Sequence, residues 1–139
     1  MHYTIYNICP GLTGGFLITG GDPGSSQKKI ELFNPISGNS CPVQDMEVGR
    51  FAHTSCSGLV CGGYYSVPAR RSCVKITGTE VSPLPSLTLR QERRGHLCWT
   101  QTGPGNKIML LGGSTSPTTT EIVSGSSSSE GFTLPYKTQ

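Results

Sequence analysis

The chain has 139 residues, the size of one ordinary domain, and is rich in glycine (19) and proline (10). Charged residues make up only 14% of it, and a net charge of +3 is too small to indicate a nucleic-acid-binding protein. No apolar run approaches the roughly 18 residues that a membrane-spanning helix needs. The first residues do not match a secretory signal peptide, so a secreted form would carry its signal upstream. This composition predicts a turn-rich, helix-poor chain that binds no nucleic acid and has no membrane span.

Four short strands are predicted in each repeated unit, and motifs mark three of them in the first part of the chain. An apolar run, FLITGG, ends in the glycine doublet Gly20 and Gly21. The stretch KIELFNP follows about ten residues later and is rich in the apolar residues that strands favour. The stretch CPVQDME then closes this first unit.

The second unit shows the full pattern of four strands. The first predicted strand follows His53, and a turn at Ser57 and Gly58 leads to the apolar run LVC, which ends in the doublet Gly62 and Gly63. SCVKITG is the third predicted strand, and VSPLPSL is the fourth.

The third unit repeats this order. A strand is predicted after His96, the run IMLLGG ends in Gly112 and Gly113, and TTEIVSG follows. The serine-rich stretch at residues 124–131 is predicted to be a flexible loop. FTLPY is predicted to be the closing strand.

Two unrelated markers recur with nearly the same period. The doublets are 42 and 50 residues apart, and His53 and His96, each with an arginine three residues earlier, are 43 apart. A single doublet would indicate no more than a hairpin turn, but this recurrence predicts a structural repeat. The apolar runs lack alternation, which predicts burial on both faces of each sheet. Sheets stacked face to face around an axis would supply that burial, with glycines where space is short.

These markers resemble the Kelch repeat, whose period is about 50 residues and whose signature is a glycine doublet after an apolar strand. The resemblance is strongest from Thr13 to Pro135, and stretches such as RQERRGHLCW are similar to Kelch-like proteins of invertebrate animals. It implies an all-β fold of about three four-stranded antiparallel propeller blades in one region, 1–139, with blades at 1–49, 50–92 and 93–139. Such a set is either a partial propeller or half of a ring closed by another copy. The Kelch tryptophan of the fourth strand is missing, and Cys41 stands near its place in the first unit.

Six cysteines are an even number, which in a β-rich chain favours disulfides and an extracellular or secretory-lumen location. The alternative is a cytoplasmic protein with buried free thiols. No C-x2-C pair is present, so zinc is not predicted.

The strand order suggests which cysteines pair. Cys61 ends a second strand and Cys73 begins the neighbouring third strand, so they are predicted to be cross-strand partners. Cys41 leaves the first blade as Cys56 enters the second, so these two are predicted to pair between blades. A Cys56–Cys61 bridge across the intervening turn competes with both predictions. Cys9 and Cys98 would be left over.

No enzyme site or cofactor is predicted. His53 and His96 occupy equivalent places in successive units, whereas an active site needs only one constellation, so they are predicted to form hydrogen bonds within or between blades. The acidic residues form no close pair, and no nucleophile, phosphate-binding or metalloprotease motif is present. The residues predicted to be structural parts of the repeat are Gly20, Gly21, Gly62, Gly63, Gly112, Gly113, His53 and His96.

Partner contacts are predicted in two places. Tyrosine and arginine are enriched in binding hot spots, and both occur in the loop after the second doublet. The basic run RQERR is either a solvated connection between blades or a contact patch. The predicted contact residues are Tyr64, Tyr65, Arg70, Arg71, Arg90 and Arg94.

The sequence therefore favours a non-enzymatic protein-interaction scaffold. Its partners would be another protein, the remaining propeller blades or a second copy of the chain. One alternative is a structural component that docks onto an assembly through exposed blade faces. A second is a propeller enzyme whose site is completed by missing blades.

Overall fold

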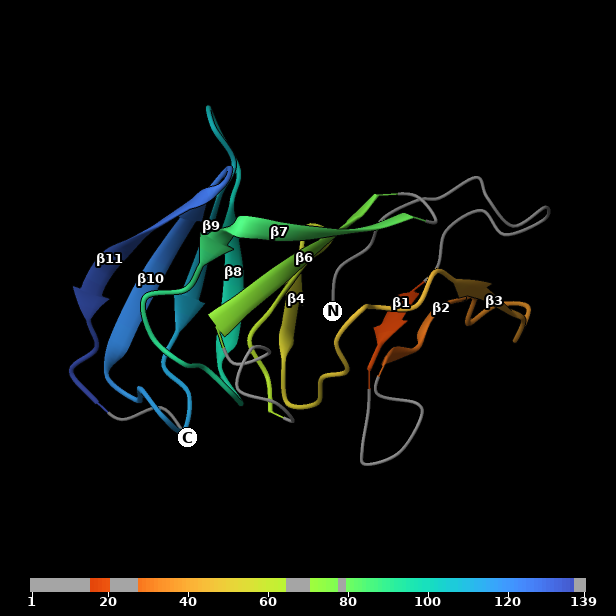
Figure 1. Ribbon diagram of the computed structural model, residues 1–139, viewed down its shortest axis with the longest axis horizontal. Coiled ribbons are helices and arrows are strands. Elements are labelled where there is room, and N and C mark those ends of the chain that lie inside the picture. The colour runs from red at the N-terminus through yellow and green to blue at the C-terminus, as the bar shows by residue number, and fades with distance from the viewer. Residues whose placement is uncertain (1–15, 21–27, 65–70, 78–79, 137–139) are drawn as a thin grey trace.

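The computed structural model describes residues 16–20, 28–64, 71–77 and 80–136 (Figure 1). Within these residues the chain forms eleven β-strands in three antiparallel sheets, which confirms the prediction of an all-β fold. No helix of the described part is long and apolar enough to cross a membrane.

Each sheet is a meander in which consecutive strands are neighbours. The N-terminal sheet contains β1 (Phe16–Thr19), β2 (Ile30–Phe33) and β3 (Ser40–Val43). The middle sheet contains β4 (Thr54–Cys56), β5 (Leu59–Cys61), β6 (Ser72–Thr77) and β7 (Glu80–Thr88). The C-terminal sheet contains β8 (Leu97–Gln101), β9 (Lys107–Leu111), β10 (Thr119–Ser124) and β11 (Ser127–Thr133). The predicted four strands are therefore present in the last two units, and three are present in the described part of the first.

The predicted serine-rich loop was wrong. Residues 127–133 form β11, which pairs with β10 after a tight turn, with Ser124 opposite Ser127. Serine is a poor strand former, but pairing with β10 supplies the backbone hydrogen bonds, and Ser128 Oγ also donates to Thr88 O at 3.0 Å. Tertiary context has overridden local propensity here.

The three sheets share one register at the end of the apolar strand. Thr19 pairs with Ile30, Cys61 pairs with Cys73, and Leu111 pairs with Thr120. In each sheet, the glycine after the apolar strand donates its N–H to a backbone carbonyl on the neighbouring strand, over 2.8–3.1 Å. The carbonyl belongs to the residue just before the partner named above. Residues one repeat apart can therefore be matched by position.

The sheets stand side by side, and the middle sheet lies between the other two (Figure 1). β4 contacts β8 and β7 contacts β11, so the middle and C-terminal sheets are stacked first strand on first and last on last. All three residues of β5 are buried: Leu59 and Cys61 belong to the core shared with the C-terminal sheet, and Val60 to the core shared with the N-terminal sheet. The predicted burial on both faces is confirmed for β5 but not for β1, where Ile18 is 49% exposed.

The two recurring motifs pack against each other between sheets. Gly62 has φ +65, and a Cβ added to it would lie 2.5 Å from Arg93 O and 2.9 Å from His96 Cε1. Gly20 meets the equivalent atoms of Arg50 and His53. In the first two doublets, the first glycine thus packs against the arginine-histidine segment of the next unit, which explains why the two motifs recur together. The described doublet glycines that have positive φ are Gly20, Gly62, Gly63, Gly112 and Gly113.

Gly62→Ala is expected to destabilise the protein by at least about 2 kcal/mol, because an L-residue is strained at positive φ and the methyl group would collide with a backbone carbonyl. Gly125→Ala is the matched control, because Gly125 also has positive φ (+59) but faces open space. Urea unfolding of both variants measures the difference. Equal losses would mean that the packing of the Arg93 segment on Gly62 contributes nothing.

One predicted disulfide is confirmed and the other was wrong. Cys61 and Cys73 are bonded across β5 and β6, with their Cα atoms 4.2 Å apart. Cys56 is bonded to Cys98, with a Cα separation of 6.2 Å, which excludes both its predicted bridge to Cys41 and the competing bridge to Cys61. Cys41 is also disulfide-bonded. Cys9 lies outside the described residues.

The Cys56–Cys98 bond joins two sheets, because Cys56 is on β4 and Cys98 on β8. Its sequence separation is 42 residues, against 12 for Cys61–Cys73. The chain-entropy model therefore predicts a loss of about 4 kcal/mol for Cys56→Ala/Cys98→Ala and about 3 kcal/mol for Cys61→Ala/Cys73→Ala. Denaturant unfolding without reductant would measure the two losses of unfolding free energy. A larger loss for Cys61→Ala/Cys73→Ala than for Cys56→Ala/Cys98→Ala would contradict the prediction.

Candidate functional site

Two buried arginines precede the first strands of the middle and C-terminal sheets. Arg93 Nη1 donates to Gly112 O (2.8 Å) and to Thr119 O (3.2 Å), and its Nε pairs with Glu121 Oε2 at 3.2 Å. Arg50 Nη1 likewise donates to Gly62 O (2.9 Å) and Ser72 O (3.0 Å). Each arginine thus ties a glycine doublet to the third strand of its own sheet, which is a structural use of the guanidinium group.

His53 forms the predicted hydrogen bond between sheets. Its Nε2 and Thr19 Oγ1 are 2.6 Å apart. His96 does not follow the prediction, because neither of its buried ring nitrogens has a hydrogen-bond partner within the described residues. The reason lies in the repeat: Cys61 occupies the position that Thr19 holds in the first unit, and its sulfur is committed to Cys73.

Burial lowers the pKa of both histidines from 6.5 to about 4, and the neighbouring arginine charge, Arg50 for His53 and Arg93 for His96, lowers it further. Both imidazoles are therefore neutral at pH 7. In the described part of the chain, no three His, Cys, Asp or Glu side chains are grouped so that they could hold a metal ion. Both histidines pack between sheets, and His53 also forms a hydrogen bond between them.

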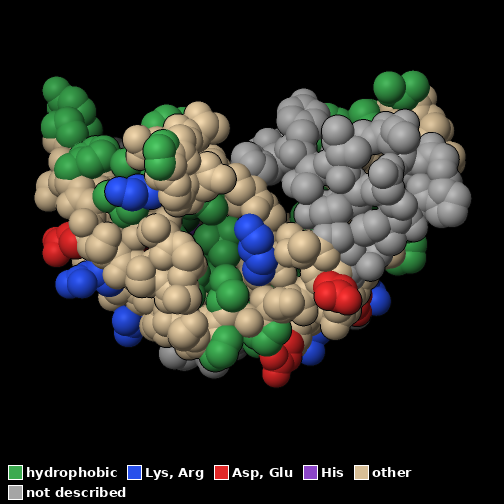
Figure 2. All heavy atoms as spheres, turned by 90° about the horizontal axis from the view of Figure 1, so that it is seen from above, with side chains coloured by type: hydrophobic (Ala, Val, Ile, Leu, Met, Phe, Trp, Pro, Cys, Tyr) green, Lys and Arg blue, Asp and Glu red, His purple; other side chains and the backbone are tan. Residues whose placement is uncertain are grey.

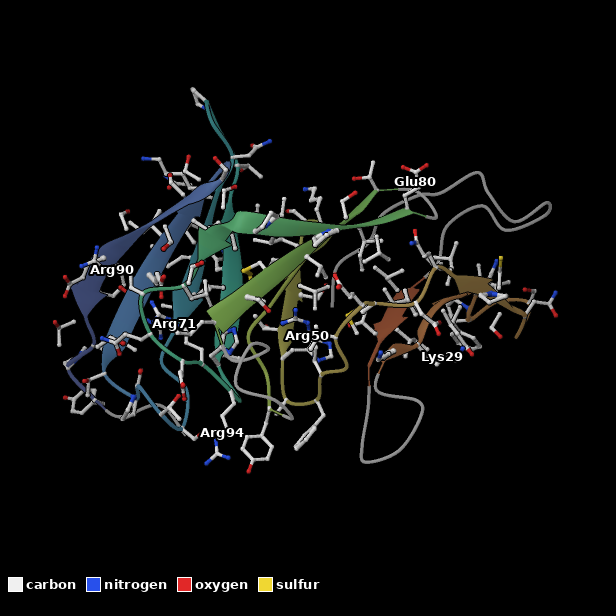
Figure 3. The ribbon with its side chains drawn as sticks, in the orientation of Figure 1. Lys29, Arg50, Arg71, Glu80, Arg90 and Arg94 are labelled. Atoms are coloured by element: carbon white, nitrogen blue, oxygen red, sulfur yellow. A yellow bond between two sulfur atoms is a disulfide. The ribbon has the colours of Figure 1, made fainter. Side chains whose placement is uncertain are left out.

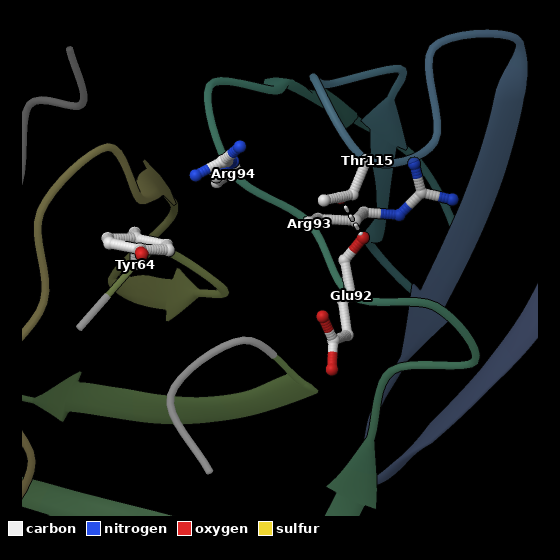
Figure 4. A pocket seen from close by; sticks show the side chains of 6 residues that line it. Tyr64, Glu92, Arg93, Arg94 and Thr115 are labelled. Atoms are coloured by element: carbon white, nitrogen blue, oxygen red, sulfur yellow. Dashed lines mark hydrogen bonds between the residues drawn. The ribbon is translucent and has the colours of Figure 1, made fainter. Parts of the chain in front are cut away.

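A pocket of about 260 Å³ opens at the boundary between the middle and C-terminal sheets, and we call it the Tyr64 pocket (Figure 4). Tyr64 and Arg94 lie on one side of it, while Glu92 and Thr115 lie on the other (Figure 4). The residues that line it are Gly63, Tyr64, Glu92, Arg93, Arg94 and Thr115. The pocket thus brings together an aromatic ring, a cation and an acid.

The Tyr64 ring is held on two sides. The Phe51 ring meets it edge-on with centroids 5.2 Å apart, and the Arg94 guanidinium carbon lies 4.9 Å from its centroid. Arg94 is itself fixed by a 2.8 Å bond from its Nε to Ser114 Oγ. A cation over an aromatic face is attractive, so the two predicted contact residues stabilise each other's position.

Backbone bonds position the walls of this pocket. Tyr64 follows the second glycine doublet and exchanges backbone hydrogen bonds with Phe51 (2.8 and 3.3 Å). Gly63 N donates to Arg93 O at 2.8 Å, which connects the middle sheet to the segment that carries Glu92 and Arg94. On the far side, Thr115 Oγ1 donates to Glu92 O. The pocket therefore rests on paired backbone rather than on free loops.

Arg71 and Arg90 lie together in a second pocket, of about 400 Å³, which we call the Arg71 pocket. Arg71 Nε donates to Leu89 O at 2.7 Å, and Arg90 N donates to Glu121 Oε1. The Arg90–Glu130 ion pair is 4.0 Å long and exposed, so it adds little to stability. Figure 3 shows Arg94 at the lower edge of the molecule, away from Arg71 and Arg90. The predicted contact residues therefore divide between two pockets.

Three predicted site residues, Gly21, Tyr65 and Arg70, lie outside the described residues. Sequence reasoning missed Glu92, Ser114 and Thr115. The last two follow the third doublet as Tyr64 follows the second, so their place in the repeat was an available signal. On the face in Figure 2, basic and acidic side chains are dispersed rather than gathered into one charged patch.

A comparison with protein-family models found none that matches this chain, and a comparison with curated proteins found no match either. What the chain does must therefore be inferred from the geometry of its own side chains.

Proposed function

We propose that the chain is a set of Kelch-type propeller blades that binds another protein through the Tyr64 pocket and carries out no chemistry of its own. Three consecutive meanders with one shared register support the blade proposal, as does the stacking of first strand on first strand. The observation that carries the binding proposal is the Tyr64–Arg94 pair beside a cavity. Tyrosine and arginine are among the residue types enriched in the hot spots of protein interfaces.

The pocket is suited to binding because its key groups are already ordered. The bond to Ser114 and the contact with Tyr64 fix the guanidinium of Arg94, so little side-chain entropy would be lost when a partner docks. The Arg94 guanidinium can donate to a partner's carboxylate or carbonyl oxygen, and the Tyr64 ring offers an apolar face. Glu92, across the pocket, can accept from a partner's N–H group.

The disulfides support an extracellular or luminal place for this function. Cys56–Cys98 and Cys61–Cys73 would persist in an oxidising compartment, whereas cytosolic reductants would keep such thiols reduced. A partner would then be a secreted protein or the outer part of a membrane protein.

A random peptide library displayed on phage would test the proposal. Peptides would be selected on the wild-type protein, and their affinities compared on Tyr64→Ala/Arg94→Ala. We expect at least about tenfold weaker binding by this variant, the effect of losing an interface hot spot. Tyr136→Ala/Lys107→Ala is the matched control, because it removes an exposed tyrosine and an exposed cation away from the pocket.

Two results would contradict the proposal. One is a selection that yields no peptide specific for the folded wild-type protein. The other is a set of peptides that bind the Tyr64→Ala/Arg94→Ala variant as tightly as they bind the wild type and the control.

A further inference from the structure

The C-terminal sheet has an apolar face that no other sheet of the described residues covers. Neighbouring side chains in a strand point to opposite faces, and Cys98 on β8 and Leu110 on β9 face the middle sheet. The alternate residues therefore lie on the far face. Leu97 is 64% exposed and Trp99 54% exposed. By the pairing of strands β8, β9 and β10, the residues of this open C-terminal face are Leu97, Trp99, Met109, Leu111 and Ile122.

The equivalent face of the middle sheet is covered. Positions one repeat earlier than Trp99, Met109 and Leu111 are Cys56, Leu59 and Cys61. All three are buried in the core shared with the C-terminal sheet. The open C-terminal face thus has the character of a surface that receives another sheet of the same kind.

The N-terminal sheet presents the complementary surface at the other end of the molecule. Ile18, on its face away from the middle sheet, is 49% exposed. Its equivalents in the next two sheets are Val60 and Leu110, which are buried against the preceding sheet. Glu31, beside Ile18, is equivalent to Glu121, whose carboxylate is buried between the middle and C-terminal sheets as an ion pair with Arg93. We call this surface the open N-terminal face.

We propose that the open C-terminal face of one chain binds the open N-terminal face of a second copy, head to tail. The contact would repeat, between chains, the stacking that the described sheets make within one chain. Two different surfaces are joined, so the assembly either closes into a ring or grows as a filament. This association uses neither wall of the Tyr64 pocket and so goes beyond the proposed binding function.

Trp99 provides a test that needs no mutation, because it is the one tryptophan of the sequence. Association would bury its indole ring, so its fluorescence emission should shift to shorter wavelength as the protein concentration rises. Light scattering after size-exclusion chromatography should show a parallel rise in mass. A single-chain mass and an unchanged emission maximum at every concentration would overturn the proposal.

Charged substitutions on the two faces test the head-to-tail geometry. Trp99→Asp and Ile18→Asp should each weaken self-association by at least about tenfold, because each places a carboxylate in an apolar contact. Ile36→Asp is the matched control, since Ile36 is 95% exposed and lies in the turn between β2 and β3. Circular dichroism would show whether each variant is folded. If Trp99→Asp does not fold, Trp99→Lys replaces it in the experiment.

Mixing the two variants decides the orientation. The Trp99→Asp chain keeps its open N-terminal face and the Ile18→Asp chain keeps its open C-terminal face, so the mixture should form a one-to-one complex that neither forms alone. Normal self-association of Ile18→Asp, together with no complex in the mixture, would mean that two C-terminal faces pair, and would overturn the proposal. The Tyr64→Ala/Arg94→Ala variant should associate like the wild type, which separates this result from the peptide-binding test.

Discussion

Replacing Arg93 with methionine is expected to destabilise the protein by roughly 3–5 kcal/mol, the cost of leaving one member of a buried ion pair without its partner. Arg93 is 1% exposed and Glu121 0% exposed. The substitution would leave the buried Glu121 carboxylate with the Arg90 N–H as donor but without the compensating guanidinium charge. It would also remove the donors to Gly112 O and Thr119 O. Chemical denaturation at pH 7 measures the loss.

The double variant Arg93→Met/Glu121→Leu is the control for the buried charge. Removing both partners eliminates the uncompensated carboxylate, so part of the lost stability should return relative to Arg93→Met. The two carbonyl acceptors would still lack their donor, so recovery should be incomplete. A double variant that is less stable than the single one would contradict this account.

Acid should destabilise the protein through His53 and His96. The folded-state pKa of each lies near 4, below the ordinary value of 6.5. Between these values the unfolded chain binds more protons than the folded one, so stability falls as the pH falls. Stability that is fully present above pH 6.5 is lost on the way to pH 4, by about 3 kcal/mol for each histidine.

Unfolding free energies measured from pH 7 to pH 4 would test this expectation. The variant His53→Gln/His96→Gln cannot titrate in this range, so its stability should depend much less on pH, although it starts from a lower value at pH 7. Parallel pH profiles for wild type and variant would show that carboxylates, not these imidazoles, control the acid response.

Much of the fold could be predicted from the repeat in the sequence. The runs before the doublets are short, apolar and bounded by glycine, which is the pattern of a buried strand, and the Cys61–Cys73 bond follows from the order of neighbouring strands. The serine-rich strand β11 could not be predicted in this way, because its stability comes from pairing with β10 and not from its own side chains.

The Cys56–Cys98 bond left a signal that could have been used. The histidines are 43 residues apart, whereas these cysteines are 42 apart. Cys98 is therefore one residue short of the position equivalent to Cys56. Because a shift of one residue moves a side chain to the opposite face of its strand, the two sulfurs lie on the facing surfaces of adjacent sheets. The prediction instead relied on Cys41 leaving the first unit as Cys56 enters the second, which favoured the wrong pair.

The candidate site was harder to predict than the sheets. Tyr64 and Arg94 were both singled out by residue type, but their contact depends on how tightly two sheets approach. That approach is set by glycines such as Gly62, whose missing side chain leaves room for the next unit's backbone. Residue type therefore identified Tyr64 and Arg94 as contact residues, whereas the packing between sheets determines that they lie together.

The disulfide between β4 and β8 has a consequence for how the molecule responds to a protease. Strands β5, β6 and β7 lie within the loop that it closes. A protease that cuts once inside this loop would leave two fragments still covalently attached, so the nicked protein would migrate as one species until a reducing agent was added. The Tyr64 pocket lies across the same boundary, and its walls would stay together after such a cut.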